Sequence, residues 1–366
     1  MKTEIKVLEA FYGDCILINT FDSSEQPFTI LVDGGPSKTF KYTLRKELKD
    51  LQVIDLLVLT HIDADHISGL IRFLKGSEFS NIDVKRYWIN GANLARVSTG
   101  EKISFAQGKT LEELLLQHEP SKKWEDQIYY TGDDITLSKG VRCKVLSPTK
   151  VILDKLHSNW PEVSKELISG PEEIQIARGV PSQVGRGSLE ELAGQTFMPA
   201  KKIDTDLANG SSIAFLLNLP DASILLLGDS RAEVVEASLK TLGYSVDNPI
   251  STDYVKISHH GSKNNTSCGM LDLIDSEHFV ISTNGGSGKS KHPDREILAR
   301  ILYHPGRNQD VERTIYFNYP VEVIQQKSGV LFGKEELETA NCRVVDESPL
   351  ILGPLKNNRK GIADGR

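Results

Sequence analysis

Four side chains able to bind a metal ion fall within six consecutive residues of the chain: His61, Asp63, Asp65 and His66. They follow the nearly continuous apolar run 54–59, which is typical of a strand covered on both faces. A loop at the carboxyl end of such a strand can turn several side chains toward one point. Imidazole and carboxylate ligands together favour Zn, Mn or Fe, so the sequence predicts a hydrolytic metal site.

A structural zinc site and a simple helix cap are the other interpretations of this cluster. No cysteine lies nearby, which disfavours a structural zinc site. A helix is predicted from Gly69 onward, and Asp65 or Ser68 could cap it. Two His and two Asp at this spacing have no capping purpose, so metal binding is the better interpretation.

Two predicted strands in the second half of the chain lead into further candidate ligands. A strand ending at Leu227 is followed by Asp229, which can bind a metal or serve as the N-cap of the next helix. A later strand, residues 254–258, leads into His259 and His260. Side chains of adjacent residues diverge, so one imidazole can bind a metal while the other faces a substrate.

These strings together resemble a known family. The sequence from His61 to His66 resembles the HxHxDH or HxDxDH signature of the metallo-β-lactamase superfamily. The string His259-His260-Gly261-Ser262 resembles the HHGS of its ComEC-type branch, the metallohydrolase and nuclease domain of competence DNA-uptake channels. The resemblance implies an α/β fold, the αββα sandwich of that superfamily, with the site at one edge of two packed sheets.

The resemblance also implies roles for several residues. Asp229 matches the superfamily's metal-bridging Asp, and we expect His259 to be a ligand and His260 a supporting or substrate contact, with the reverse order open. Asp14 and Asp33 match elements in which an Asp supports the metal loop from outside the ligand set. By spacing alone, the better explanation of both is a turn residue beside glycines.

One position departs from the wider superfamily. Most members have a further His between the first cluster and the bridging Asp, but here that interval holds only His118 and His157, neither at a strand end. Asn209 and Ser212 instead match an NxxS element of ComEC-type members, and we expect both, with Ser262, at the substrate. Fewer His and more oxygen ligands shift the metal preference from Zn toward Mn or Mg.

The implied mechanism uses two divalent cations, Mn or Zn with Mg as an option. Asp229 and a hydroxide bridge the cations, and the hydroxide attacks a phosphodiester. The two expected ligand sets are His61 with Asp63, and Asp65 with His66 and His259. The expected catalytic residues, which stabilise charge, move protons or position the metal, are Asp65, His260, Lys263 and His292. The alternative for His292 is a helix-start residue beside a proline at the first helical position.

The chain divides into four predicted segments. Residues 1–149 and 207–325 are expected to form the two halves of the sandwich. Residues 150–206 change in character and predict a partly helical, partly loop insertion, either a roof over the site or a surface loop. Residues 326–366 are expected to form a C-terminal extension with strand-like pieces such as 329–332 and a disordered end.

The composition sets limits on the environment and the substrate. With 39% hydrophobic and 25% charged residues, the chain is typical of a globular protein. It has no apolar stretch of membrane-spanning length and begins with a strand-like alternation, so we expect a cytoplasmic protein without membrane contact. Four scattered cysteines indicate free thiols. The net charge of −7 disfavours tight nonspecific nucleic-acid binding but leaves room for a local basic patch.

The sequence hypothesis is a metal-dependent phosphodiester hydrolase, a nuclease with DNA as the favoured substrate. Two alternatives remain: a hydrolase of a small ester, lactone or phosphorylated metabolite, and an effector module that is silent until a regulatory protein partner activates it. Assembly of the chain into an oligomer is left open. A basic groove at the site would favour nucleic acid, and a closed pocket beneath the insertion would favour a metabolite. The candidate groove residues are Lys256, Lys263, Lys289 and Lys291.

Overall fold

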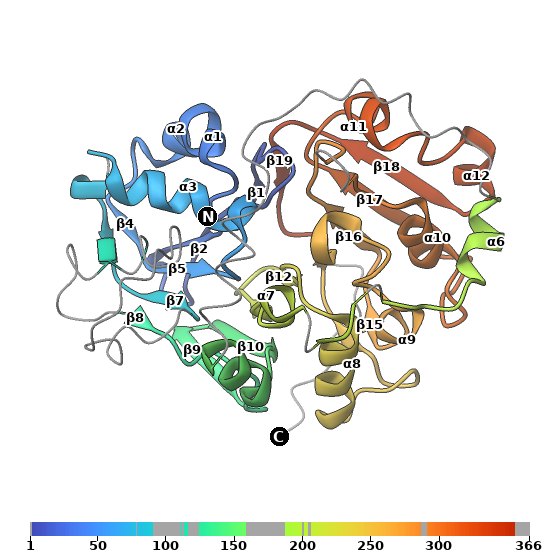
Figure 1. The fold of residues 1–366 in the computed structure, drawn as a ribbon, viewed down its shortest axis with the longest axis horizontal. Coiled ribbons are helices and arrows are strands. Elements are labelled where there is room, and N and C mark those ends of the chain that lie inside the picture. The colour runs from blue at the N-terminus through green and yellow to red at the C-terminus, as the bar shows by residue number, and fades with distance from the viewer. Residues whose placement is uncertain are drawn as a thin grey trace.

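The structure is a computed structural model. It describes residues 2–77, 79–90, 111, 113–115, 124–158, 187–199, 201–203, 206–286 and 291–355. Within them, two large β-sheets pack face to face (Figure 1). The seven-stranded sheet has the order β19 (Leu350–Leu352), β1 (Glu4–Val7), β2 (Ile16–Phe21), β3 (Pro27–Val32), β5 (Leu56–Leu59), β7 (Tyr87–Ile89) and β8 (Trp124–Glu125).

The second sheet has eight strands, and both termini of the chain contribute to the sandwich. Its order is β18 (Cys342–Asp346), β17 (Arg313–Phe317), β16 (His278–Ile281), β14 (Tyr254–Lys256), β12 (Ser223–Leu226), β11 (Ala214–Asn218), β10 (Val141–Ser147) and β9 (Asp134–Ser138). Two short parallel pairs stand beside the sheets: β4 (Val53–Ile54) with β6 (Asp83–Val84), and β13 (Ile250–Ser251) with β15 (Ile274–Asp275).

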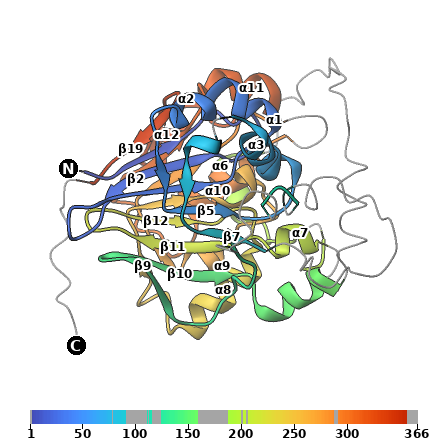
Figure 2. The ribbon, with the colours of Figure 1, turned by 90° about the vertical axis from the view of Figure 1, so that its left-hand side faces the viewer.

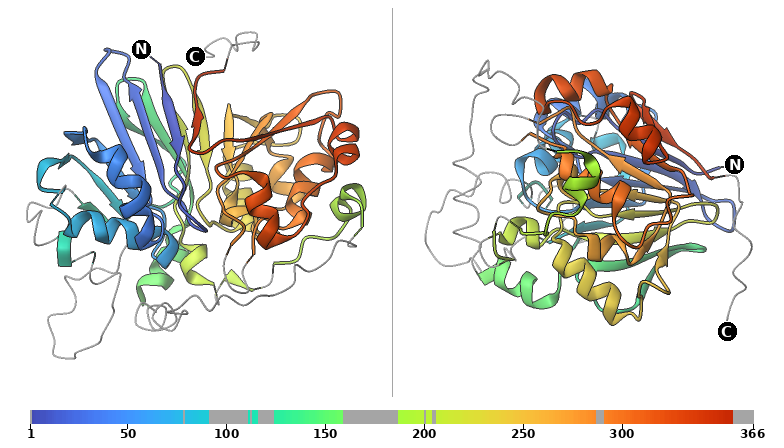
Figure 3. Two further views of the ribbon diagram at one scale, coloured as in Figure 1. Left: turned by 90° about the horizontal axis from the view of Figure 1, so that it is seen from above. Right: turned by 90° about the vertical axis from the view of Figure 1, so that its right-hand side faces the viewer.

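Helices cover the outer face of each sheet, which gives four layers (Figure 3). On the first sheet lie α1 (Ser37–Thr39), the π-helical turn η1 (Phe40–Leu44), α2 (Arg45–Leu48) and α3 (Ala64–Lys75). On the second lie α8 (Ala232–Thr241), α9 (Cys268–Leu271), α10 (Arg295–Tyr303) and α11 (Val321–Ser328). Further helical elements include η2 (Phe79–Asn81), α6 (Leu189–Ala193), α7 (Leu207–Gly210), η5 (Ser258–Gly261) and α12 (Lys334–Thr339).

Three apolar clusters fill the three interfaces between these layers. The central one joins the inner faces of the two sheets, including Ile18 and Val58 from the first and Phe215 and Leu226 from the second. The other two lie between each sheet and its helices. Side chains of the central strands are buried on both faces, which explains the nearly continuous apolar runs in the sequence. The predicted αββα sandwich is therefore confirmed.

The expected insertion and extension are only partly described. Residues 150–158 are helical and α6 follows later, whereas most of the segment between them lies outside the described residues, as does the tail 356–366. The prediction of a strand over 329–332 was wrong, because these residues are an irregular link between α11 and α12. The last segment instead places β18 beside β17 in one sheet and β19 beside β1 in the other.

Parallel pairing sets the position of the functional loops. Strands β3, β5 and β7 run parallel in the first sheet, and β12, β14, β16 and β17 run parallel in the second. The loops that follow parallel strands all leave from the same edge of a sheet, which is where open α/β sheets bind ligands. A hydrogen bond of 2.9 Å from the Ile213 N–H to the Thr60 carbonyl joins the two sheets at this edge. In Figure 2 this is the end at which α7 lies, far from the N-terminus.

Candidate metal centre

The candidate ligands come from loops that follow four different strands. Asp33 comes directly after β3, His61 two residues after β5, Asp229 three residues after β12, and His259 three residues after β14. Although far apart in sequence, these loops meet at the shared edge of the sandwich. The helix-cap alternatives are wrong: the N-cap of α3 is Asp63, without a side-chain cap, and α8 has Arg231 as its N-cap.

The first group of converging side chains is His61, His66 and Asp229, all of them buried. His66 Nε2 lies 3.4 Å from Asp229 Oδ1, and His61 Nε2 lies 3.8 Å from Asp229 Oδ2. Asp63 approaches from the open side, with its Oδ2 3.5 Å from His61 Nε2. Two imidazoles and two carboxylates therefore point at a common volume, which is a donor set suited to a divalent cation.

A second group adjoins the first and contains Asp65 and His260. His260 Nε2 lies 3.4 Å from Asp65 Oδ2 and 3.7 Å from Asp229 Oδ2. Asp229 thus faces both groups at once, as the resemblance implied for a bridging residue. His259 also approaches Asp229, at 3.7 Å through Nε2, but it belongs to none of the converging groups and its side chain is 27% exposed.

Several buried polar atoms of these residues have no hydrogen-bond partner within the protein. They include the Nε2 atoms of His61, His66 and His260 and the Oδ1 atoms of Asp63 and Asp229. Buried polar atoms normally find a partner, and leaving one without a partner costs about 1–3 kcal/mol. A bound divalent cation would satisfy these atoms together. The residues present therefore fit a metal centre.

Asp33 holds the first group from behind. Its Oδ2 lies 2.8 Å from His66 Nδ1 and accepts a 2.7 Å hydrogen bond from the Thr60 hydroxyl, while its Oδ1 accepts one of 2.8 Å from the Thr60 N–H. A carboxylate on Nδ1 leaves Nε2 free to bind a metal and fixes the plane of the ring. Ser212 acts similarly on Asp229, because its hydroxyl accepts a 2.9 Å hydrogen bond from the Asp229 N–H.

A buried cation that the sequence reasoning misassigned supports the second group. Lys256 is 1% exposed, and its ammonium pairs with the buried carboxylate of Asp14 and lies 3.3 Å from the Gly228 carbonyl. The other oxygen of Asp14 lies 3.4 Å from His260 Nδ1. The expectation that Lys256 lines an open basic groove is wrong. The available signal was a lysine inside an apolar strand, a position that requires a buried counter-charge.

The backbone at the histidine pair is left-handed. His259 and His260 have φ values of 49° and 55°, a region that residues other than glycine rarely adopt and that clusters at functional sites. The next residue, Gly261, has φ of +86°, and a Cβ there would lie 2.6 Å from the Pro293 Cβ. This tight turn directs His260 inward between Asp14 and Asp65, while His259 remains at the rim.

Burial and neighbouring charges shift the pKa values of the His and Asp side chains in the candidate metal centre. Burial lowers the pKa of His66, but Asp229 and Asp33 outweigh it and raise that pKa well above 6.5. Burial also lowers the pKa of His260, but the negative charges of Asp229 and Asp14 outweigh it and raise that pKa to about 10. Burial would raise the pKa of Asp229, yet the surrounding imidazoles hold it well below its usual value. Burial dominates for His259 and lowers its pKa.

The remaining predicted residues lie around the rim or behind it. The ring of His292 is 5.4 Å from that of His259, and its Nδ1 is 3.4 Å from Asp294 Oδ2. The helix-start alternative for His292 is wrong, because α10 begins at Arg295. The ammonium of Lys263 is held by Glu296 at 2.8 Å.

The structure also places the three predicted substrate contacts and one of the two other lysines predicted for a basic groove. Asn209 donates to Asp206 at 2.9 Å, and its buried Oδ1 has no partner. Ser262 is buried and accepts a hydrogen bond of 3.3 Å from the Asn264 N–H, and Ser212 supports the backbone at Asp229. Of the two lysines, Lys291 is exposed and Lys289 lies outside the described residues.

Comparisons with known proteins agree with this geometry. Residues 10–134 match the model of the Metallo-beta-lactamase superfamily. ComE operon protein 3 of Bacillus subtilis (strain 168) is 26% identical over 233 residues, which cover 61% of this chain. The match spans 27% of that relative's own length.

Solved structures with low sequence identity include a diphosphatase of the PhnP family and a long form of RNase Z from yeast. The diphosphatase is 11% identical, with 96% of this chain and 97% of that chain covered and a TM-score of 0.39. The RNase Z is 12% identical, with 87% of this chain and 36% of that chain covered and a TM-score of 0.35. At these TM-scores neither likeness supports a functional inference.

Residues 10–134 therefore resemble a metallo-beta-lactamase superfamily domain, in agreement with the packed sheets of the fold. The converging His and Asp side chains form candidate sites for divalent metal ions at the edge of this sandwich. Among the described residues, no helix combines the length and apolar character needed to cross a membrane.

Proposed function

We propose that the protein is a phosphodiester hydrolase that uses two divalent cations and acts on nucleic acid, with DNA as the preferred substrate. The observation that carries the proposal is the position of Asp229, whose carboxylate lies within 3.8 Å of imidazole nitrogens from His61, His66, His259 and His260. One carboxylate that faces two adjoining ligand groups is the arrangement that paired-metal hydrolysis requires.

The proposed ligand sets follow from the distances. His61, His66 and Asp229, with Asp63 at the rim, would hold one cation. Asp65 and His260 would hold the other, together with Asp229. This assignment reverses the order that we expected for the histidine pair, since His260 is the buried member and His259 the exposed one.

The chemistry that bound cations supply is Lewis acidity, which activates water near neutral pH and offsets charge on phosphoryl oxygens. The protein supplies the remaining steps. His259 and His292 stand next to each other at the rim, where the scissile ester would lie. Asp294 Oδ2 lies 3.4 Å from His292 Nδ1, where its charge favours the protonated ring, and His292 would donate a proton to the leaving oxygen. Lys263 acts indirectly, because its N–H donates to Asp294 Oδ2 at 3.0 Å.

Two features support a phosphodiester over a carboxylic ester or lactone. The His259-His260-Gly261-Ser262 string resembles that of ComEC-type nuclease domains, and the chain is similar to ComE operon protein 3. The three carboxylates Asp63, Asp65 and Asp229 also make the ligand set rich in oxygen. Hard cations such as Mn and Mg prefer such sets and bind phosphate oxygens well.

The test is hydrolysis by the purified chain in Mn, Mg or Zn against linear DNA, circular DNA, RNA and bis(p-nitrophenyl) phosphate. We expect metal-dependent cleavage of DNA that falls by at least about a thousandfold in Asp65→Ala and His66→Ala, because each removes a metal contact. Asp133→Ala, which changes an exposed carboxylate directly before β9, is the matched control and should retain full activity.

Circular dichroism and thermal unfolding of each variant separate loss of the site from loss of the fold. Cleavage that survives in both site variants would refute the proposal. Cleavage of the small ester but of no nucleic acid would replace it with the small-substrate hydrolase.

A further inference from the structure

We propose that the helical face formed by η1, α2 and the end of α3 binds the backbone of a single-stranded nucleic acid and leads it to the metal centre. This inference rests on the proposed function and extends it from the reacting phosphate to the rest of the substrate. A basic pocket, an exposed aromatic side chain and the continuity of α3 with the site carry it.

The face is strongly basic in a protein whose net charge is −7. Lys41, Arg45, Lys46 and Lys49 are exposed and line a pocket of 430 Å³. The same segment holds two acidic residues: Glu47, which is held by Lys6 at 2.8 Å, and the exposed Asp50 after Lys49. Clustered basic side chains of this kind neutralise phosphates and are the electrostatic mark of a nucleic-acid surface.

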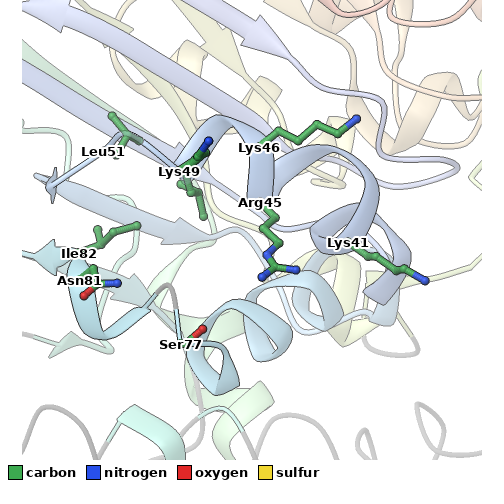
Figure 4. Close-up of a pocket in the computed structure, with 9 residues that line it drawn as sticks. Lys41, Arg45, Lys46, Lys49, Leu51, Ser77, Asn81 and Ile82 are labelled. Atoms are coloured by element: carbon green, nitrogen blue, oxygen red, sulfur yellow. The ribbon is translucent and has the colours of Figure 1, made fainter.

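The shape of the pocket suits a nucleotide chain. Figure 4 shows the four basic side chains along η1 and α2, with Ser77 and Asn81 on the opposite wall. Leu51 and Ile82 add apolar lining at one end of the pocket, beside Lys49 and Asn81 (Figure 4). A pocket lined by basic, polar and apolar side chains can hold a phosphate, a sugar and a base edge together.

Aromatic side chains connect this face to the metal centre. Tyr42 is 49% exposed, its ring lies 5.1 Å from the Lys41 ammonium, and the Phe11 ring packs edge-on against it at 6.4 Å. The loop that begins at Phe11 rests on the metal loop, since the Asp14 N–H donates to the Asp65 carbonyl at 3.3 Å. An exposed aromatic ring beside lysines is the platform on which unpaired bases stack.

The spacing defines the length of strand involved. Helix α3 has Asp65 in its first turn and Lys75 as its last residue, and Ser77 beyond it lines the pocket. Twelve helical residues extend about 18 Å, or roughly five nucleotides at about 3.4 Å per nucleotide. A trinucleotide bound at the metal centre would therefore not reach the basic pocket, whereas a 20-mer would.

The first experiment measures binding without metal, so that its outcome does not depend on catalysis. Fluorescence anisotropy of a labelled 20-nucleotide single strand is recorded in EDTA from 50 to 200 mM KCl. We expect the variant Lys41→Gln/Arg45→Gln/Lys46→Gln/Lys49→Gln to bind at least about tenfold more weakly than wild type. The slope of log affinity against log salt should become shallower by up to about 3.

The matched control changes the same number of exposed basic residues elsewhere. It combines Lys2→Gln, Lys139→Gln, Lys240→Gln and Lys334→Gln. This control should bind within twofold of wild type. A second variant, Tyr42→Ala, should weaken binding of the single strand more than binding of a duplex, because only unpaired bases stack on the ring.

Three results would overturn the inference: an equal loss of affinity in the two quadruple variants, no binding of the single strand by wild type, or a larger loss of affinity for duplex than for single strand in Tyr42→Ala. Cleavage separates this inference from the proposed function. Both quadruple variants should hydrolyse bis(p-nitrophenyl) phosphate and a trinucleotide like wild type, while the variant of the basic face cleaves the 20-mer more slowly. A wild type that binds the strand but cleaves nothing would refute the proposed function alone.

Discussion

Replacement of Lys256 by methionine tests the buried ion pair behind the metal centre. Lys256 and Asp14 are each 1% exposed, and their charged groups contact each other directly. Methionine has a similar length but no charge, so Lys256→Met leaves the Asp14 carboxylate buried without its main counter-charge. The pKa of Asp14 shows the balance: burial raises it, but the Lys256 and His260 charges together hold it well below its usual value.

The expected loss is large because removal of one partner of a buried pair leaves an uncompensated charge. Such changes lower the free energy of unfolding by about 3–5 kcal/mol. Asp14→Asn should have an effect of similar size, since it leaves the buried Lys256 ammonium without its partner. In the double variant no buried charge remains, so its loss should be smaller than the sum of the single losses by at least about 2 kcal/mol.

The assay is urea unfolding in EDTA, followed by tryptophan fluorescence and circular dichroism at pH 7.5. The matched control is the pair Lys150 and Asp154, whose side chains are each 55% exposed at a separation of 2.8 Å. Lys150→Met and Asp154→Asn should each change the free energy of unfolding by less than about 0.5 kcal/mol. Additive losses at positions 14 and 256, or losses below about 1 kcal/mol, would refute the reasoning.

Three further results are expected. Asp33→Asn should weaken Mn binding by about 10–100-fold in equilibrium dialysis, while Asp133→Asn leaves it unchanged, because only Asp33 orients a candidate ligand, His66. Metal binding at pH 7 should release protons and should become tighter as the pH rises, because the pKa of His260 is raised to about 10 and a metal binds the neutral imidazole. Calorimetry in buffers of different ionisation enthalpy measures the proton release, and a value of zero would contradict the prediction. Burial lowers the pKa of His304 from 6.5 to about 4, so the contribution of the neutral imidazole to the free energy of unfolding should be complete above pH 6.5. It should decline as the pH falls toward 4, by up to about 1.4 kcal/mol per pH unit. Urea unfolding would contradict this prediction if His304→Gln showed the same pH dependence as wild type between pH 6.5 and 4.

Most of the fold was predictable because its signals are local. Apolar runs followed by glycine or polar residues indicated the parallel strands, and the loop from His61 to His66 holds its candidate ligands within six residues. The order of the strands was not predictable from such signals. It depends on pairings between distant segments, such as β19 with β1 and β18 with β17.

The site was less predictable wherever backbone conformation or long-range charge decides it. The left-handed turn at His259 and His260 determines which imidazole points inward, and two adjacent histidines give no indication of that conformation. The partner of Lys256 is 242 residues away in sequence, so only the lysine's position in an apolar strand hinted at a buried acid.

Metal content tests the central claim most directly. The chain is loaded with Mn, freed of excess by gel filtration, and measured by mass spectrometry of the elements, alongside Asp229→Asn and the control Asp133→Asn. Because the Asp229 carboxylate faces both ligand groups, we expect about two equivalents per chain in wild type and control, and no more than about one in Asp229→Asn, with its circular dichroism unchanged. Equal metal content in wild type and Asp229→Asn, or a wild type that retains none, would contradict the account.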